Sequence, residues 1–158
     1  GVVKGVYKEN NPMYAYKVYD RFKIYRPLAD KYTKWRNNLT PYDIQGYEQL
    51  PKKGDLLIIT KSMKDIMCLY EMGYTAISPA SESTFLTPDV IDALKLRFKR
   101  ILICFDRDIS GVKNMRKISL KTGLNGFLVH KKFQSKDISD AIKNNGFEVI
   151  KNWLKETL

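Results

Sequence analysis

The sequence has 158 residues, of which 44% are hydrophobic and 28% are charged, an ordinary composition for one globular domain with a real core. It contains no apolar run long enough to span a bilayer and no charged-then-apolar leader, so we expect no membrane partner and no export signal. Basic residues outnumber acidic ones by 28 to 17, a net charge of +11 that is typical of proteins with phosphate-rich partners. Because the chain begins with Gly1 and not with methionine, we expect it to be part of a longer protein.

The cysteines and the histidine argue against several kinds of site. Cys68 and Cys104 lie in apolar surroundings without a second cysteine nearby, which predicts reduced core thiols in a cytoplasmic protein. His130 is the only histidine, so zinc binding and histidine-based catalysis are not expected.

The first predicted element is a β-hairpin, with strands near 14–19 and 22–26 and a tight turn at Asp20-Arg21, because bulky and polar residues alternate on both sides of that pair. Aromatic residues alternate there with lysine and arginine, a pattern that suits single-stranded nucleic acid through stacked bases and paired phosphates. The alternative is that the rings only pack one face of the hairpin. We favour packing for most of the rings and phosphate contact for some of the cations. The basic segment 31–38 is predicted to be a loop.

After residue 54 the pattern changes to alternating strands and helices. Strands are predicted at 55–60, 75–78, 100–105 and 126–130, and helices at 63–73, 89–98, 112–123, 138–146 and 147–158. This order predicts an α/β fold with a mostly parallel sheet flanked by helices. We therefore divide the chain into a small basic subdomain, residues 1–53, and an α/β domain, residues 54–158.

Two aspartates follow the most apolar strand, in the stretch "ILICFDRDISG". Asp106 and Asp108 stand where the strand leaves the sheet, and the edge formed by the carboxyl ends of parallel strands is where binding sites form in such folds. Two carboxylates this close in sequence can converge on one hard cation. The alternative is a solvated turn, because aspartate and glycine favour turns without any metal.

The stretch "FDRDISG", followed by a helix, resembles the Asp-x-Asp-x-x-Gly motif of the TOPRIM domain, over roughly residues 54–146. The preceding segment, from Tyr14 to Asn38, resembles the small basic subdomain of bacterial and phage DnaG-type primases. In "KDISDAIKNNG", Asp137 and Asp140 match the acidic pair of that family. Asp65 also matches a family position, but Lys61 stands where the family has a glutamate. Glu82, in the loop after the next strand, is a candidate replacement, although it equally suits a solvated loop that caps the next element.

This resemblance implies a primase core that joins ribonucleoside triphosphates on a single-stranded DNA template, with Mg²⁺ or Mn²⁺ as cofactor and a replicative helicase as a further partner. It would act in the cytoplasm of a bacterial or phage-infected cell. The implied catalytic residues are Asp106, Asp108, Lys61 and Glu82. The implied metal ligands are Asp106, Asp108, Asp65, Asp137 and Asp140. Template or nucleotide contacts are expected from Lys23, Arg26, Lys34 and Arg36. Lys61 leaves two alternatives open: a TOPRIM nucleic-acid-binding module with impaired catalysis, and a metal-dependent TOPRIM nuclease.

Overall fold

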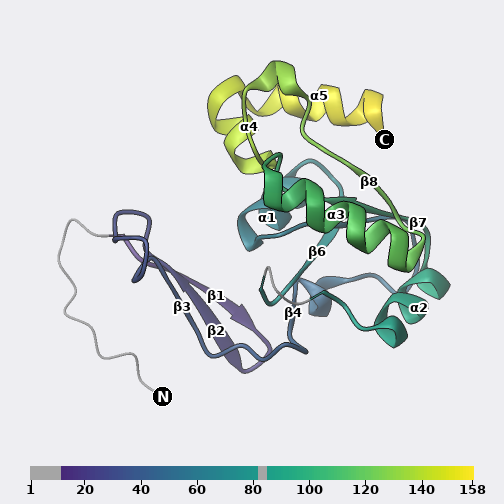
Figure 1. Ribbon diagram of the computed structural model, residues 1–158, viewed down its shortest axis with the longest axis horizontal. Helices are drawn as coiled ribbons and strands as arrows, with labels where there is room; N and C mark the ends of the chain where they lie inside the picture. Colours follow the sequence, from purple (N-terminus) through teal and green to yellow (C-terminus); the bar gives the residue numbers. More distant parts are fainter. Residues whose placement is uncertain (1–11, 82–84) are drawn as a thin grey trace.

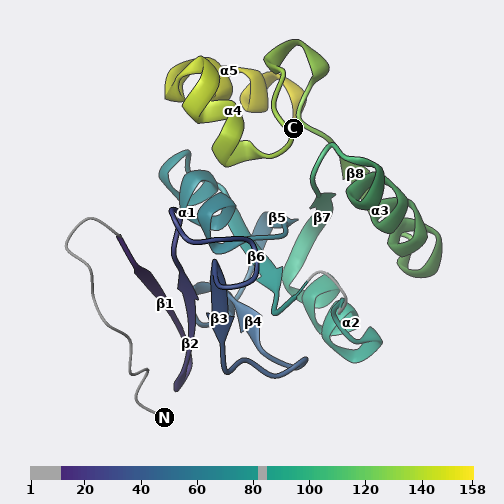
Figure 2. The same cartoon turned by 60° about the vertical axis from the view of Figure 1, so that its left-hand side comes forward.

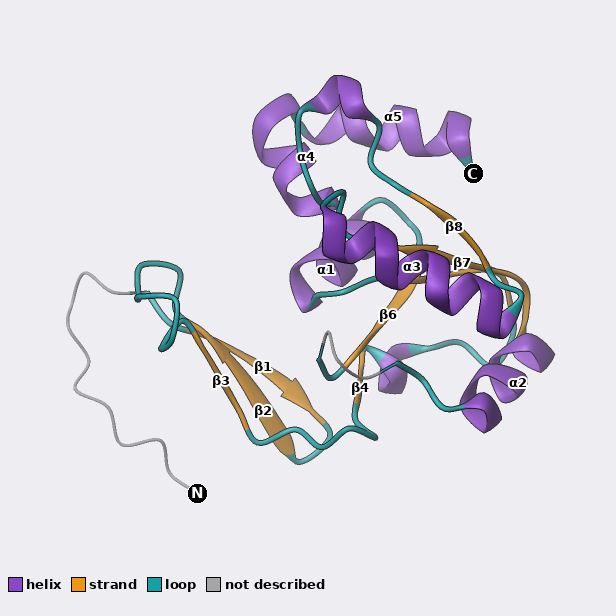
Figure 3. Ribbon diagram, viewed as in Figure 1, coloured by secondary structure: helices purple, strands orange, loops and turns teal. Residues whose placement is uncertain are grey.

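The chain forms two sheets, a small antiparallel sheet followed by a larger, mostly parallel one (Figures 1 and 3). The computed structural model describes residues 12–81 and 85–158. Across the small sheet the order is β1 (Tyr14–Val18), β2 (Arg21–Tyr25) and β3 (Trp35–Asn37). Across the large sheet it is β4 (Ile44–Gln45), β6 (Thr75–Pro79), β5 (Gly54–Ile59), β7 (Phe98–Cys104) and β8 (Asn125–Phe127).

The predicted hairpin is present, but its turn lies one residue earlier than expected. Val18 pairs with Arg21, so Tyr19 and Asp20 form the turn, and Tyr19 adopts a left-handed conformation with φ of 54°. The prediction of a loop over 31–38 is wrong for its last part, because β3 pairs with β2 there. A strand of three residues is too short to carry a clear alternation, which explains why the sequence did not reveal it.

The expected α/β fold is confirmed. Strands β6, β5, β7 and β8 run parallel, and only β4 is antiparallel, at the edge beside β6. The two residues of β4 come from the segment assigned to the basic subdomain, so the large sheet begins before residue 54.

Helices cover both faces of the large sheet because the side chains of its strands alternate. Ile58 of β5 packs with α1 (Met63–Glu71), α4 (Ile138–Asn145) and α5 (Phe147–Thr157). Leu57 and Ile59 face the other way, towards α2 (Pro88–Arg97) and α3 (Ile109–Thr122). Two short 3₁₀ helices complete the chain, η1 (Tyr47–Gln49) and η2 (Lys131–Phe133). Of the helices in the described ranges, none has the length and hydrophobicity needed to cross a bilayer.

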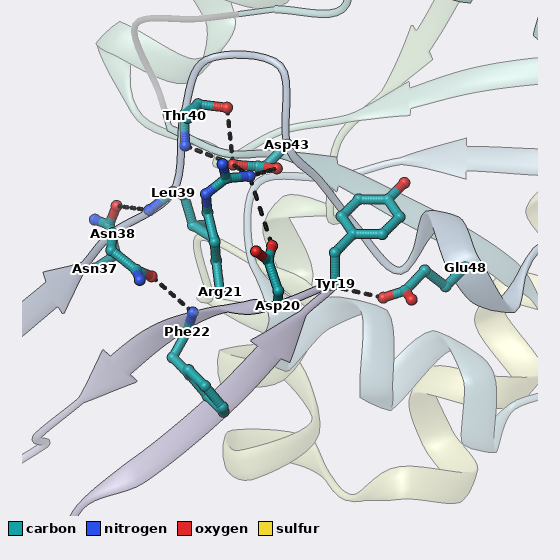
Figure 4. A network of polar contacts seen from close by, with 10 residues as sticks. All are labelled: Tyr19, Asp20, Arg21, Phe22, Asn37, Asn38, Leu39, Thr40, Asp43 and Glu48. Carbon is teal, nitrogen blue, oxygen red and sulfur yellow. Dashed lines mark hydrogen bonds and ion pairs between the residues drawn. The ribbon is translucent and has the colours of Figure 1, made fainter. Parts of the chain in front are cut away.

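The turn of the hairpin is tied to the segment that leads into the large sheet (Figure 4). Arg21 donates from Nη1 to both carboxylate oxygens of Asp43, at 3.0 and 3.3 Å, and the Asp43 side chain is only 7% exposed. Thr40 donates to the same carboxylate from its backbone N and from its hydroxyl. Burial opposes ionisation of Asp43, but the hydrogen bonds from Thr40 and the charge of Arg21 outweigh it and hold its pKa below the usual value. The backbone N of Tyr19 adds a bond to Glu48 Oε2 at 2.8 Å.

These contacts lead us to expect that Arg21 is needed to hold the small sheet in place. Arg21→Ala leaves a buried carboxylate without its cation, and we expect the free energy of unfolding in urea to fall by about 1–3 kcal/mol. The control is Lys99→Ala, which removes the partner of Asp55 from an ion pair whose side chains are both 83% exposed. That change should leave the free energy of unfolding nearly unchanged, because solvent screens an exposed ion pair. Equal losses in the two variants would show that the Arg21–Asp43 pair anchors nothing.

Candidate functional site

The acidic residues predicted as site residues gather at one edge of the large sheet. Lys61 follows the end of β5, and Asp106 follows the end of β7, which is its parallel neighbour. Asp65 lies in the first turn of α1, and Asp137 stands at the start of α4, which contacts α1. The carboxyl ends of parallel strands meet at the same edge, so this convergence follows from the topology.

Asp108 and Gly111 shape the turn between β7 and α3. Asp108 is the N-cap of α3, and its Oδ1 accepts a hydrogen bond of 2.7 Å from the backbone N of Gly111. A Cβ atom at position 111 would overlap the backbone carbonyl oxygen of Asp106, so only glycine lets the first turn of the helix pass this close. The helix therefore starts at Ile109, three residues before the predicted start. The Asp-x-Asp-x-x-Gly motif thus forms the start of α3, and it places Asp106 at the carboxyl edge of the large sheet.

Lys61 and Asp106 form an ion pair inside the site. Lys61 Nζ lies 3.8 Å from Asp106 Oδ2, and the two side chains are only 8% and 14% exposed. Burial raises the pKa of the Asp106 carboxyl, the charge of Lys61 opposes this rise, and the negative charge of Asp137 adds to it. The lysine therefore supplies positive charge where the TOPRIM resemblance calls for a glutamate.

Asp65 is buried and held by several donors. Its Oδ2 accepts hydrogen bonds from the hydroxyls of Ser62, at 2.8 Å, and of Thr60, at 3.4 Å. Its Oδ1 accepts from the backbone N of Ser139, at 3.0 Å, which links α1 to α4. Burial raises the pKa of Asp65 to about 6, and the nearby charge of Asp137 contributes to the same shift.

The second acidic pair belongs to the start of α4. Asp137 is the N-cap, and its Oδ1 accepts from the backbone N of Asp140, at 2.7 Å, and from the hydroxyl of Ser139, at 2.9 Å. Burial alone would lower the pKa of Lys136, but the charges of Asp106, Asp137 and Asp140 outweigh it and raise that pKa. Lys136 and Ser139 are site residues that sequence reasoning did not identify, although the Asp-x-x-Asp spacing at 137–140 is a helix-capping signal that places them.

The donors of this site suit a hard cation, but they do not enclose one. All of the acidic donors are oxygens, which Mg²⁺ and Ca²⁺ prefer. In the part of the chain that the structure describes, however, no three acidic, cysteine or histidine side chains are grouped closely enough to hold an ion. Mg²⁺ is commonly bound by only one or two carboxylates together with water and substrate phosphates. Asp106 and Asp108 therefore offer oxygen donors of the kind that hold such an ion.

The four basic residues predicted to contact nucleic acid lie in three different environments. Lys23 and Lys34 stand over the aromatic rings of Trp35 and Tyr25. Arg26 donates from Nε and Nη2 to the carbonyl oxygen of Thr33, within its own loop. Arg36 follows Trp35 along β3, so it points to the opposite face of the small sheet. Glu82 lies outside the described residues.

A pocket of about 500 Å³ opens beside Lys61, between α2 and α3. Phe105 and Ile118 contribute to its apolar surface, and Lys117 and Lys121 to its charged side. Both lysines lie on exposed positions of α3, and neither makes an ion pair with any described acidic residue. Phosphate groups placed in this pocket would meet the positive charge of Lys117 and Lys121.

The family model described as Toprim-like matches residues 58–142, more than half of the chain. No curated protein matches the sequence. Solved structures match by fold, and one is a DnaG primase catalytic domain bound to single-stranded DNA, with a TM-score of 0.65 and 17% identity over 86% of this chain and 47% of that one. A primase fragment of the bacteriophage T7 primase-helicase protein has a TM-score of 0.63 and 15% identity, over 92% and 63% of the two chains.

The primase catalytic core of E. coli gives a TM-score of 0.61 and 17% identity, over 84% of this chain and 47% of that one. The chain thus spans about half to under two thirds of the length of these structures. At such identities the similarity shows a shared fold, that of primase catalytic cores. The family match is a match to the sequence itself, and it runs from the end of β5 through most of α4. It includes the five acidic residues of the sheet edge, Asp65, Asp106, Asp108, Asp137 and Asp140. The chain belongs to the Toprim-like family.

Proposed function

We propose that this chain is the catalytic core of a DNA primase, which joins ribonucleotides into a primer on single-stranded DNA. The observation that carries the proposal is the gathering of acidic residues at the carboxyl edge of the sheet, beside a small basic sheet, in a fold shared with primase cores. One of those structures is of a DnaG primase catalytic domain bound to single-stranded DNA. A further structure of similar fold is of the bacteriophage T7 lagging-strand DNA polymerase interacting with primase domains, in a complex with an RNA/DNA hybrid and dTTP. We place the reaction in the cytoplasm of a bacterial or phage-infected cell.

The reaction forms a bond between the 3′-oxygen of one nucleotide and the α-phosphorus of the next, and breaks the bond to pyrophosphate. The task of the protein is mainly to orient the two nucleotides and to neutralise developing negative charge. Asp106 and Asp108 would hold Mg²⁺ or Mn²⁺, with Asp65, Asp137 and Asp140 supporting them through water. When bound, the ion activates the attacking oxygen and stabilises the leaving group. Glu82 remains a proposed contributor.

Lys61 gives the cleft a fixed positive charge of its own. Its ammonium group is held beside Asp106 and also lines the pocket between α2 and α3. It can contact the triphosphate of the incoming nucleotide on one side while neutralising Asp106 on the other. Lys117 and Lys121 extend this positive charge along the pocket.

The basic side of the cleft is proposed to receive the template, through Lys23 and Lys34 first and through Arg26 and Arg36 at the periphery. A replicative helicase is a further proposed partner, because one solved relative is the primase fragment of a primase-helicase protein.

The Lys61–Asp106 pair also favours a second function, a TOPRIM module that binds nucleic acid without polymerising it. A lysine in the cleft neutralises an acidic residue that catalysis would use for a metal ion. Both functions require single-stranded DNA to bind, and they differ only in whether primers are made.

The first test is primer synthesis. The protein should form short RNA when incubated with single-stranded DNA, labelled ribonucleoside triphosphates and Mg²⁺ or Mn²⁺. Asp106→Asn with Asp108→Asn should reduce the rate by at least about a hundredfold, because both ligands of the ion are weakened. Asp55→Asn is the control, since Asp55 is an exposed acidic residue at the opposite end of β5. DNA binding without any RNA product would support the binding module over the primase.

The second test concerns position 61. Lys61→Glu replaces the cation beside Asp106 with a carboxylate, and we expect the increase in melting temperature caused by millimolar Mn²⁺ to grow. Lys61→Gln is the matched control, because it removes the ammonium group without adding an acid. If the two variants respond to Mn²⁺ equally, position 61 does not belong to the metal site.

The third test uses the protonation of Asp65. Its pKa is about 6 in the folded chain, compared with an ordinary value of 3.8. Between about pH 4 and 6 the Asp65 carboxyl is therefore protonated in the folded chain but ionised in the unfolded chain. The free energy of unfolding consequently falls as the pH rises through this range. Asp65→Asn cannot ionise, and its free energy of unfolding relative to wild type should increase by on the order of 1–3 kcal/mol between about pH 4.5 and 7, in the presence of a chelator.

The matched control for this test is Asp55→Asn. Asp55 is exposed, and its hydrogen bond to Lys99 lowers its pKa, so its substitution should give no such increase. Parallel stability curves for wild type and Asp65→Asn would show that Asp65 ionises normally.

A further inference from the structure

Three aromatic rings, one from each strand, form a continuous stack across the small sheet. Tyr14, Tyr25 and Trp35 lie directly opposite one another in the register. The ring centroids of Tyr14 and Tyr25 are 6.3 Å apart with planes inclined by 27°, and those of Tyr25 and Trp35 are 4.3 Å apart and inclined by 25°. We call this set the aromatic stack.

The two ends of the aromatic stack lie on the edge strands of the small sheet. Strands β1 and β3 are those edges, so no further strand of the described chain lies beside Tyr14 or Trp35 in that sheet. These two residues are 51% and 37% exposed, and Lys23 is the lysine that stands by the Trp35 ring. Rings paired across strands can serve only to stabilise a sheet. Rings that are this exposed at the two edges can also be reached from solvent by a further flat ring.

Lysine side chains surround the aromatic stack. Lys23 Nζ lies 5.3 Å from the ring centroid of Trp35, and Lys34 and Lys64 lie 5.9 and 5.7 Å from that of Tyr25. No described acidic residue forms an ion pair with Lys34 or Lys64. Flat aromatic surface and lysine side chains therefore occur together, which is the combination that binds the bases and phosphates of single-stranded nucleic acid.

The same lysines connect the aromatic stack to the acidic edge of the large sheet. Lys64 belongs to the first turn of α1 and donates to the hydroxyl of Ser139, which in turn donates to Asp137. Lys23 donates to the carbonyl oxygen of Ala80, just after β6. In the turned view of Figure 2 the small sheet stands beside α1 and β4. A DNA strand that lies on the aromatic stack would therefore be next to the acidic edge of the large sheet.

We propose that Tyr14, Tyr25 and Trp35 are a base-stacking platform, on which bases of single-stranded DNA extend the aromatic stack while Lys23, Lys34 and Lys64 contact its phosphates. The proposal rests on the proposed function in one respect, namely that the bound strand is the template. It changes the interpretation of the hairpin, in which most of the rings were expected to serve packing. It also separates Lys23 and Lys34, beside the stack, from Arg36, on the other face of the sheet.

The first experiment observes the platform directly. The intrinsic tryptophan fluorescence of the protein should be quenched when a short oligothymidylate is added, because a base stacks on Trp35. Trp35→Phe keeps an aromatic ring but should abolish the quenching, which assigns the signal to this residue and not to Trp153. Unchanged fluorescence at saturating oligothymidylate overturns the proposal.

The second experiment separates bases from phosphates. Affinities are measured by fluorescence anisotropy for an oligothymidylate and for an abasic oligonucleotide of equal length, which has the phosphates but no bases. Tyr14→Leu with Trp35→Leu should weaken binding of the oligothymidylate about tenfold or more, because stacked bases contribute strongly to affinity, and leave binding of the abasic strand within about twofold. Tyr32→Leu, at a tyrosine that is 90% exposed and outside the stack, should change neither affinity.

Further measurements control for folding and for the proposed function. Trp35→Phe should retain most of the affinity because it keeps a ring, and circular dichroism shows whether each variant remains folded. Equal losses for the two oligonucleotides in a folded variant overturn the platform, because the rings would then act only by supporting the sheet. Quenching without primer synthesis supports the platform and counts against the primase. Primer synthesis without quenching supports the primase and overturns the platform.

Discussion

Crowding of negative charge at the carboxyl edge of the large sheet is the constraint on which the rest of this structure depends. Four carboxylates there each have a fixed partner. Asp108 and Asp137 accept hydrogen bonds from backbone amides at the starts of α3 and α4, Asp65 accepts from Ser139 of the neighbouring helix, and Asp106 has Lys61. Hydrogen bonds and cations of this kind lower the cost of burying like charges close together. The same bonds fix where the helices begin, so the positions of the helices and the arrangement of the acids have one cause.

The hydrogen bonds and cations at this edge do not fully relieve the repulsion between the carboxylates. The pKa of Asp65 is raised to about 6 by burial, with a contribution from Asp137, so the two acids still repel each other at neutral pH. Lys61 and Lys136 are the nearby cations that act on Asp106. A divalent ion or a metal-bound nucleotide would remove the remaining repulsion, which is why an acidic edge that is costly by itself suits phosphoryl chemistry. The edge of the large sheet therefore gathers negative charge, while lysine side chains gather beside the rings of the small sheet.

Much of this arrangement could be predicted from the sequence, because long elements carry clear patterns. The buried strands β5 and β7 and the order of helices around them follow from apolar runs and helix stop signals, and the Asp-x-Asp-x-x-Gly turn follows from its spacing. The short strands β3 and β4 could not be predicted, since two or three residues show no periodicity and their pairing depends on neighbours distant in sequence. The predicted start of α3 is three residues late because Asp108 was interpreted as a metal ligand or as part of a solvated turn, and not as the N-cap of the helix. The sequence also could not separate Arg36 from Lys23 and Lys34, which requires knowing that β3 is a strand.

The contact that the sequence could not supply is the one between Lys61 and Asp106. A lysine after the end of β5 predicts a departure from the TOPRIM pattern, but not which residue its ammonium group approaches. The structure places the ammonium group beside Asp106, with both side chains nearly buried. An ammonium group so placed puts positive charge beside Asp106, whereas a glutamate at the same position would add another carboxylate to an edge that already holds several. Lys61 therefore relieves part of the repulsion among the acidic side chains, which a glutamate would increase.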